Sequence, residues 1–335
     1  MPLAFKNIAD GVGFVEIPDS GGFSSVYVAG SPGDALIIDA YGAQTAPEVI
    51  AALEGAGVRP GKVRAIVVTH GHADHYGGAG ALAEWSGAPV WAHLSTALQI
   101  EDSWGGFAAP NCYAANTAPA DWEAFRAGAG GPVRVARILR EGDAFEHAGM
   151  GFEVLHVPGH DRGEIALFEP RRRLVFTGDL VQGGMDASSN WLGLFTDPAS
   201  QRRSLARIAA LAPEWSFKGH RAARAGAELG QDLACALARL DRMERALREA
   251  LAEKSPAGVA ELARAAFRKV LGKEMPEPPA YALVSTAAFL GDLARRGLVR
   301  RTPELAWEPA GGWGILNGRL NTRLAFGPCQ PPGPG

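Results

Sequence analysis

One short segment constrains this chain more than any other: Ile66–His75, with the sequence IVVTHGHADH, joins an apolar run to a cluster of polar side chains. The run Val63–Thr69 is rich in β-branched residues and predicts a buried strand. Strands and helices alternate around it, which predicts an α/β fold with ligands at the carboxyl ends of strands. Imidazole and carboxylate groups suit zinc, iron or manganese, so the segment predicts a metal site at one sheet edge.

The spacing within the segment divides its side chains between two ions. Alternate residues of an extended chain share one face, so His70 and His72 can hold one ion together. Asp74 and His75 follow a change of backbone direction and can face a second ion.

Three further candidate ligands each follow a glycine at the end of a predicted strand. They are His160 in Pro-Gly-His, Asp179 in Thr-Gly-Asp and His220 in Lys-Gly-His. A chance surface cluster would not be accompanied by such partners. The sequence therefore predicts seven metal ligands: His70, His72, Asp74, His75, His160, Asp179 and His220.

The HxHxDH segment, the later histidine, the aspartate of TGD and the last histidine resemble the metallo-β-lactamase superfamily, in its glyoxalase II-like branch. The resemblance covers about residues 10–225 and keeps the family's order of ligands. It implies an αβ/βα sandwich with the metals at one edge. It also implies that a first metal is held by His70, His72 and His160, a second by Asp74, His75 and His220, and that Asp179 bridges them.

The resemblance implies a metal-dependent hydrolase with two divalent ions. We expect zinc, with iron and manganese as alternatives. Water on such ions has a pKa lowered from 15.7 to about 7, so a metal-bound hydroxide would attack an ester, thioester or similar small carbonyl substrate. Asp74 would orient or deprotonate that water. Asp179 stands where the true zinc β-lactamases usually carry Cys, so antibiotic hydrolysis is not expected.

Some residues beside the motifs carry weaker predictions. Asp39 ends an apolar strand near the same edge and is predicted to support the metal loops. Asp161 and Glu164 after His160, and Lys218 before His220, depart from the common family pattern. A cation at this place could bind an anionic substrate group, but pairing of the lysine with Asp161 or Glu164 is the simpler interpretation.

The pattern of apolar residues changes to a helical repeat in the last third of the chain. Leucines at steps of three or four predict a long helix over Gly226–Lys254, and two helices and a hairpin containing Trp307 follow, as in a winged helix. We predict a catalytic domain over residues 1–253, a winged-helix-like domain over 254–326 and a disordered Pro/Gly-rich tail over 327–335. Residues 101–132 show neither the helical nor the strand repeat of apolar residues, and they predict either a lid over the site or a loop packed on the surface.

Composition limits the location and the partners of the chain. The net charge of −3 gives no reason to expect nucleic acid or an anionic membrane as a partner. No uncharged apolar run approaches the roughly 18 residues of a membrane span, and the N-terminus lacks a signal-peptide core. Three cysteines without a CxxC pair argue against a disulfide framework or thiolate zinc site. These features predict a soluble cytoplasmic protein with a small-molecule substrate.

Two alternatives to carbonyl hydrolysis stay open. A single-strand RNA endonuclease or phosphodiesterase would use the same two-metal site, with the winged helix on the nucleic acid. Residues 255–301 hold eight Lys/Arg and four Asp/Glu, which is a mild basic excess. A non-hydrolytic metal or redox sensor is the third hypothesis, because iron in these ligands permits oxygen chemistry. The leucine-rich helix is compatible with a homodimer.

Overall fold

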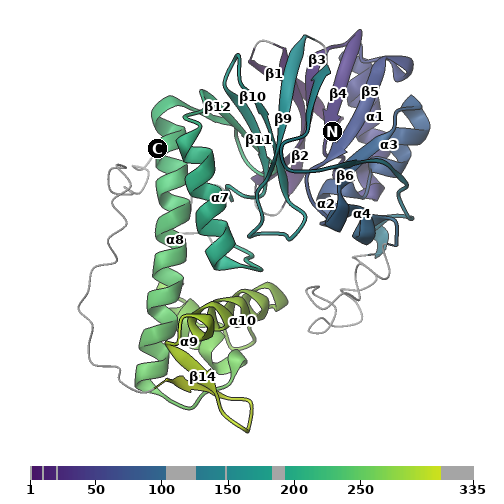
Figure 1. The fold of residues 1–335 in the computed structure, drawn as a ribbon. Coiled ribbons are helices and arrows are strands. Elements are labelled where there is room, and N and C mark those ends of the chain that lie inside the picture. Colours follow the sequence, from purple (N-terminus) through teal and green to yellow (C-terminus); the bar gives the residue numbers. More distant parts are fainter. Residues whose placement is uncertain are drawn as a thin grey trace.

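Two β-sheets pack face to face with helices on their outer sides in the computed structural model of the chain (Figure 1). The structure describes residues 2–310 apart from residues 10, 20–21, 103–125, 148 and 183–192. The predicted tail and most of the irregular segment 101–132 therefore lie outside the described residues.

The first sheet has seven strands in sequence order. Its first four strands pair antiparallel, and the remaining pairs are parallel. Parallel strands covered on both faces are apolar throughout, which explains the unbroken Ile-Val-Val run in the fifth strand. The strands are β1 (Ala4–Ala9), β2 (Val12–Asp19), β3 (Gly22–Ser31), β4 (Asp34–Ile38), β5 (Val63–Val68), β6 (Val90–His93) and β7 (Val135–Leu139).

The second sheet has six strands in the order β13-β12-β11-β10-β9-β8. Only β11 and β12 pair in parallel. The strands are β8 (Ala144–His147), β9 (Met150–His156), β10 (Ile165–Glu169), β11 (Leu174–Gly178), β12 (Trp215–Lys218) and β13 (Arg224–Ala225).

Backbone hydrogen bonds join the sheets where the loops that carry the candidate ligands meet. Ser25 N donates to Gly219 O at 2.9 Å, and Ile165 N donates to Thr69 O at 2.9 Å. Ser24 and His220, next to the first of these contacts, form an isolated antiparallel bridge, and Arg221 N donates to Phe23 O at 2.8 Å on its other side. These bonds hold the ends of the two sheets in a fixed relation.

Three apolar clusters fill the layers. One lies between the sheets, one lies between the first sheet and its helices, and one joins the second sheet to the remaining helices. The helices over the first sheet are η1 (Ala43–Thr45), α1 (Ala46–Gly55), η2 (Pro60–Lys62), α2 (Ala73–Tyr76), α3 (Ala79–Ser86) and α4 (Leu94–Ile100). Those beside the second sheet are α7 (Pro198–Ala210) and α8 (Gly226–Glu253).

The C-terminal part follows the predicted order of elements. It contains α9 (Val259–Leu271), α10 (Ala280–Arg295) and a hairpin of β14 (Val299–Arg301) and β15 (Trp307–Pro309). The apolar cluster of the second sheet continues through α8 into α9 and α10, so one core crosses the predicted boundary at residue 253. The winged-helix identity and the domain limits stay predictions.

The leucine stripe of α8 packs inside the chain. Leu233, Leu240 and Leu247 are buried in the cluster shared with the second sheet, so the pattern does not itself require a second copy. Cys235 on the same helix is disulfide-bonded, which the sequence did not predict, whereas the prediction against a framework of several disulfides stays a prediction. Within the described ranges, no helix is both long and apolar enough to cross a membrane.

Candidate metal centre

The seven predicted ligands lie at the edge where the loops of both sheets meet. β5 ends just before His70 and His72, and the short helix α2 carries Asp74 and His75. The second sheet contributes the rest: His160 after β9, Asp179 after β11 and His220 after β12.

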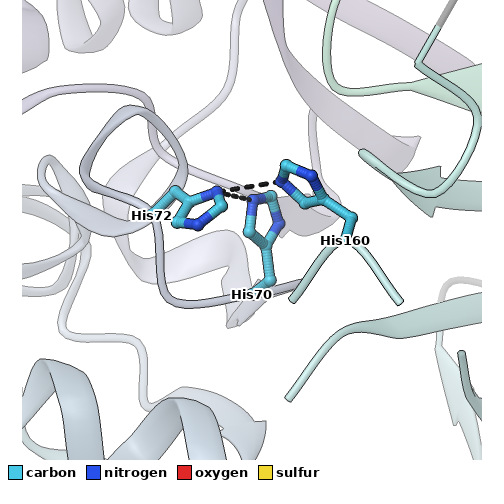
Figure 2. Close-up of side chains that lie close together, drawn as sticks. All are labelled: His70, His72 and His160. Carbon is cyan, nitrogen blue, oxygen red and sulfur yellow. Dashed lines mark hydrogen bonds between the residues drawn. The ribbon is translucent and has the colours of Figure 1, made fainter. Parts of the chain in front are cut away.

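The first group of side chains, here called the histidine group, consists of His70, His72 and His160 (Figure 2). His72 Nδ1 lies 3.0 Å from His70 Nε2 and 2.9 Å from His160 Nε2. Two nitrogens held about 2.05 Å from a tetrahedral ion are about 3.3 Å apart. The three rings therefore stand close to the arrangement that one ion requires.

The second group, here called the acidic group, consists of Asp74, His75 and His220. His220 Nε2 lies 3.2 Å from Asp74 Oδ2. Asp179 stands between the two groups: its carboxylate oxygens lie 3.6 Å from His160 Nε2, 3.5 Å from His75 Nε2 and 3.3 Å from His220 Nε2.

Hydrogen bonds outside the histidine group decide which ring nitrogens face inward. Thr69 Oγ1 donates its proton to Asp39, so it accepts from His70 Nδ1 at 3.1 Å. The Leu194 carbonyl accepts from His160 Nδ1 at 2.9 Å. Both contacts leave the Nε2 lone pairs directed at His72, as metal ligation requires.

The acidic group is oriented by carboxylates. His75 Nδ1 donates to Asp39 Oδ2 at 2.9 Å, which leaves Nε2 directed at Asp179. His220 Nδ1 lies 2.8 Å from Ser24 Oγ and 3.2 Å from Asp19 Oδ2. Because Ser24 Oγ donates to Asp19, the histidine is the donor in this contact. A carboxylate behind a ligating imidazole fixes its tautomer and raises its basicity.

The electrostatics of the two groups differ. Burial and the neighbouring rings lower the pKa of His70 well below its usual value, and burial and His72 lower the pKa of His160 to about 4. Burial alone would lower the pKa of His75 and His220, but Asp179 raises both well above the usual range. His70 and His160 therefore supply neutral imidazoles, and the acidic group stabilises positive charge.

The residues present fit bound divalent cations. Nε2 of His75 is buried and has no hydrogen-bond partner among the described residues. His72 Nδ1 can donate one proton at most, so it satisfies only one of the two nitrogens that face it. A cation between the rings would bind the facing nitrogens of all three histidines, and the carboxylates of Asp74 and Asp179 would offset the positive charge of the centre.

The prediction that Asp39 supports the metal loops agrees with its contacts. It is 2% exposed and accepts hydrogen bonds from Thr69 N at 2.8 Å and from His75. The predicted pairing of Lys218 with Asp161 or Glu164 is wrong, because the lysine is buried and its amine donates to Asp232 on α8.

Several functional contacts were not predicted. Asp19 and Ser24 lie on strands about 200 residues before His220, so no local motif connects them with it. The carbonyl of Leu194 is a backbone group, which no side-chain motif marks. Glu164 is fully buried and accepts from Asp179 N at 2.7 Å. Its unusual charge after the histidine motif was the one signal in the sequence.

The remaining histidines lie outside the centre. His93 and His156 stack with ring centroids 4.4 Å apart, and His147 Nε2 lies 3.9 Å from Asp34. The contacts of these three histidines therefore lie away from the seven candidate ligands.

Comparison with known proteins identifies the family. Residues 19–220 match the model of the Metallo-beta-lactamase superfamily, and the chain belongs to it. The chain is 30% identical over 208 residues to the acyl-coenzyme A thioesterase MBLAC2 of Gallus gallus, covering 57% of this chain and 69% of that protein. It is 30% identical over 128 residues to the hydroxyacylglutathione hydrolase GloC of Haemophilus influenzae, covering 37% and 52%.

Solved structures share the fold. A metallo-beta-lactamase family protein from Thermus thermophilus aligns with a TM-score of 0.67 at 22% identity, covering 90% of this chain and all of that one. A beta-lactamase domain protein from Burkholderia ambifaria gives the same TM-score and identity over 92% of this chain. The predicted α/β sandwich is confirmed, and the chain is a metal-dependent hydrolase of this superfamily.

Proposed function

We propose that the chain is a dinuclear metal-dependent hydrolase of thioesters, with small oxygen esters as the alternative substrates. The observation that carries the proposal is the meeting of the histidine group and the acidic group on Asp179. The relatives add support for the substrate class. The names of MBLAC2 and GloC describe cleavage of an acyl group from coenzyme A and from glutathione, which are both thiols.

The two groups would hold one ion each, most simply zinc, with iron or manganese as alternatives. His70, His72 and His160 would bind the first, Asp74, His75 and His220 the second, and Asp179 would lie between them. Divalent ions in such a site supply Lewis acidity, which acidifies water and polarises a carbonyl oxygen. The chain's own contribution is to hold the ligands rigidly, through outer partners such as Asp39 and Leu194.

Asp74 is the group that we assign to handling the water proton. Its side chain is 47% exposed, so it faces solvent as well as the centre. Partial loss of contact with water would by itself raise the pKa of Asp74, but the hydrogen bond from His220 and the charge of His75 hold that pKa well below the usual range. The carboxylate is therefore ionised at neutral pH and can orient a water molecule or accept its proton.

The nuclease alternative receives less support from the C-terminal part. Several of its basic side chains are paired with acids within the chain: Arg296 with Glu244, Lys269 with Glu253, and Arg300 with Glu308. Paired charges contribute less to a phosphate-binding surface than the sequence count suggests.

The test is a substrate panel on protein with measured metal content. Acyl-coenzyme A and S-acylglutathione thioesters are compared with oxygen esters of the same acyl groups and with single-stranded RNA. We expect thioester turnover that is lost in His72→Ala and kept in His147→Gln, a histidine outside the centre. Absence of thioester turnover in protein that carries two metals per chain would overturn the proposed substrate class.

A further inference from the structure

The segment Gly193–Asp197 lies between a metal-binding loop and the C-terminal helices. On one side, the carbonyl of Leu194 accepts from His160 Nδ1 at 2.9 Å. The next residues are bonded to the same loop, because Thr196 N and Asp197 N both donate to Gly159 O, at 2.8 and 3.0 Å. The segment is therefore the outer support of His160.

The other side of the segment is held by α10. Ser285 Oγ accepts from Phe195 N at 3.1 Å and donates to Gly193 O at 3.3 Å. One hydroxyl therefore binds the residues on both sides of Leu194. The serine is 1% exposed. Phe289, one turn further along α10, meets the ring of Phe195 edge-on with centroids 6.0 Å apart.

Gln182 completes the support from the loop after β11. Its amide pairs with both backbone groups of Leu194: Nε2 donates to the carbonyl at 2.9 Å, and Oε1 accepts from N at 3.2 Å. Gln182 Nε2 also lies 2.6 Å from His160 Nδ1, but both nitrogens carry hydrogen when the histidine donates to Leu194, so this contact is packing and not a hydrogen bond. Leu194 is thus held at its own backbone by Gln182 and at its two neighbours by Ser285.

We propose that Ser285 is a positioning residue for the metal centre: through Gly193–Phe195 it fixes the carbonyl that orients His160. The inference rests on the proposed metal binding of the histidine group. Removing the hydroxyl leaves a buried N–H and a buried carbonyl without their bonds, which favours a shift of the segment. The carbonyl of Leu194 then moves, and His160 loses its fixed orientation and tautomer.

The neighbouring residue on α10 provides a matched control. Thr286 is also fully buried, but its Oγ1 has no hydrogen-bond partner in the described part of the chain. Thr286→Val removes a buried hydroxyl from the same helix without touching Gly193–Phe195. A merely structural role of α10 would give Ser285→Ala and Thr286→Val similar behaviour.

The experiment measures metal binding by the full-length chain, independently of activity. Zinc is titrated against a competing chelator, and the absorption bands of cobalt-substituted protein report the ligand geometry. Outer partners of metal ligands typically contribute 10–100-fold to affinity, and Ser285 acts one step further out. We expect Ser285→Ala to weaken one of the two zinc sites about 10-fold and to shift the cobalt bands. Thr286→Val should leave both unchanged.

A second variant covers the case in which Ser285→Ala does not fold. Ser285→Cys keeps nearly the same volume with a weaker hydrogen bond, so it should show a smaller loss in the same site. Wild-type affinity and spectra in both serine variants, or an equal loss in Thr286→Val, would overturn the inference while leaving the proposed function intact. Wild-type protein that binds no metal would overturn both.

Discussion

The two ligand groups are built from similar side chains but are supported differently. Two members of the histidine group are deeply buried, with His70 at 0% and His160 at 2% exposure, and the outer partners of these two are a hydroxyl and a backbone carbonyl. The acidic group is more open, with the side chains of Asp74 and His220 at 47% and 33% exposure. Its outer partners include the carboxylates of Asp39 and Asp19.

This difference suggests a division of work between the two positions. Neutral imidazoles in a buried setting hold an ion by geometry, because their lone pairs are oriented and their charge is zero. Carboxylates nearby stabilise positive charge and raise the basicity of the imidazoles in front of them. The exposed face of the acidic group is where water and substrate would enter, and mutations should therefore affect the two groups unequally.

Asp179→Ala should have the largest effect, because this carboxylate contacts both groups. We expect the metal content to fall below two per chain, and turnover to fall by more than the roughly 100-fold upper range for outer partners. Mass spectrometry of metals and steady-state kinetics measure the two effects. Full metal content with normal turnover would show that Asp179 does not connect the groups.

His72→Ala and His220→Ala should separate the two groups. Each removes the inward nitrogen of one group and leaves the other intact, so we expect about one metal per chain in each variant. In cobalt-substituted protein the two variants should keep different absorption bands. Loss of both metals from either variant would mean that the groups form a single cooperative site.

Asp39→Asn should weaken the acidic group about 10–100-fold in metal affinity. Thr69 N and His75 Nδ1 donate to different oxygens of Asp39, and an asparagine amide has one oxygen, so it cannot accept from both and the tautomer of His75 is less firmly fixed. Ser24→Ala should have a smaller effect, because Asp19 still lies 3.2 Å from His220 Nδ1. Competitive zinc titration gives both affinities. Equal losses in the two variants would contradict the special role of the carboxylate.

Glu164→Gln should have the smallest effect on metal binding and a pH-dependent effect on stability. Burial, Asp179 and Asp161 raise the pKa of Glu164 well above its usual value, so the folded chain keeps it protonated. Unfolded glutamate ionises near pH 4.3, so wild-type stability falls as pH rises from there towards the folded pKa.

Glutamine lacks this dependence and can still accept from Asp179 N. The stability advantage of Glu164→Gln should therefore vanish below about pH 4 and grow by at most about 1.4 kcal/mol per pH unit above it. Denaturant unfolding in the presence of a chelator, between pH 4 and pH 8, measures the difference. A constant difference across this range would show that Glu164 is ionised in the folded chain.

The sequence predicted the parts of the molecule that are determined locally. β5 begins at the predicted residue, Val63, and ends one residue before the predicted limit. The seven candidate ligands could be named from the sequence because each stands in a short motif after a strand, and the structure brings their side chains together. Helix α7 was overlooked, although Asp197 caps its N-terminus and Pro198 occupies the first turn, which is a recognisable helix start.

The supporting contacts depend on tertiary structure and were beyond reach. Ser24 and Ser285 are ordinary serines in an apolar strand and an apolar helix, and nothing in their surroundings marks them as partners of His220 or of the Leu194 segment. The order of helices and hairpin after α8 was predicted, but an order of elements does not by itself decide whether they form a winged helix.

The bridge between Ser24 and His220 has a consequence for folding during synthesis on the ribosome. The ligands extend from residue 70 to residue 220, so the ribosome adds 150 residues between the first and the last of them. At 5–20 residues per second this takes roughly 8 to 30 seconds. During that interval the nascent chain exposes the HxHxDH segment without the strands that enclose it. Loading of both metals into the native arrangement is therefore a late event, complete only after β12 has joined the second sheet.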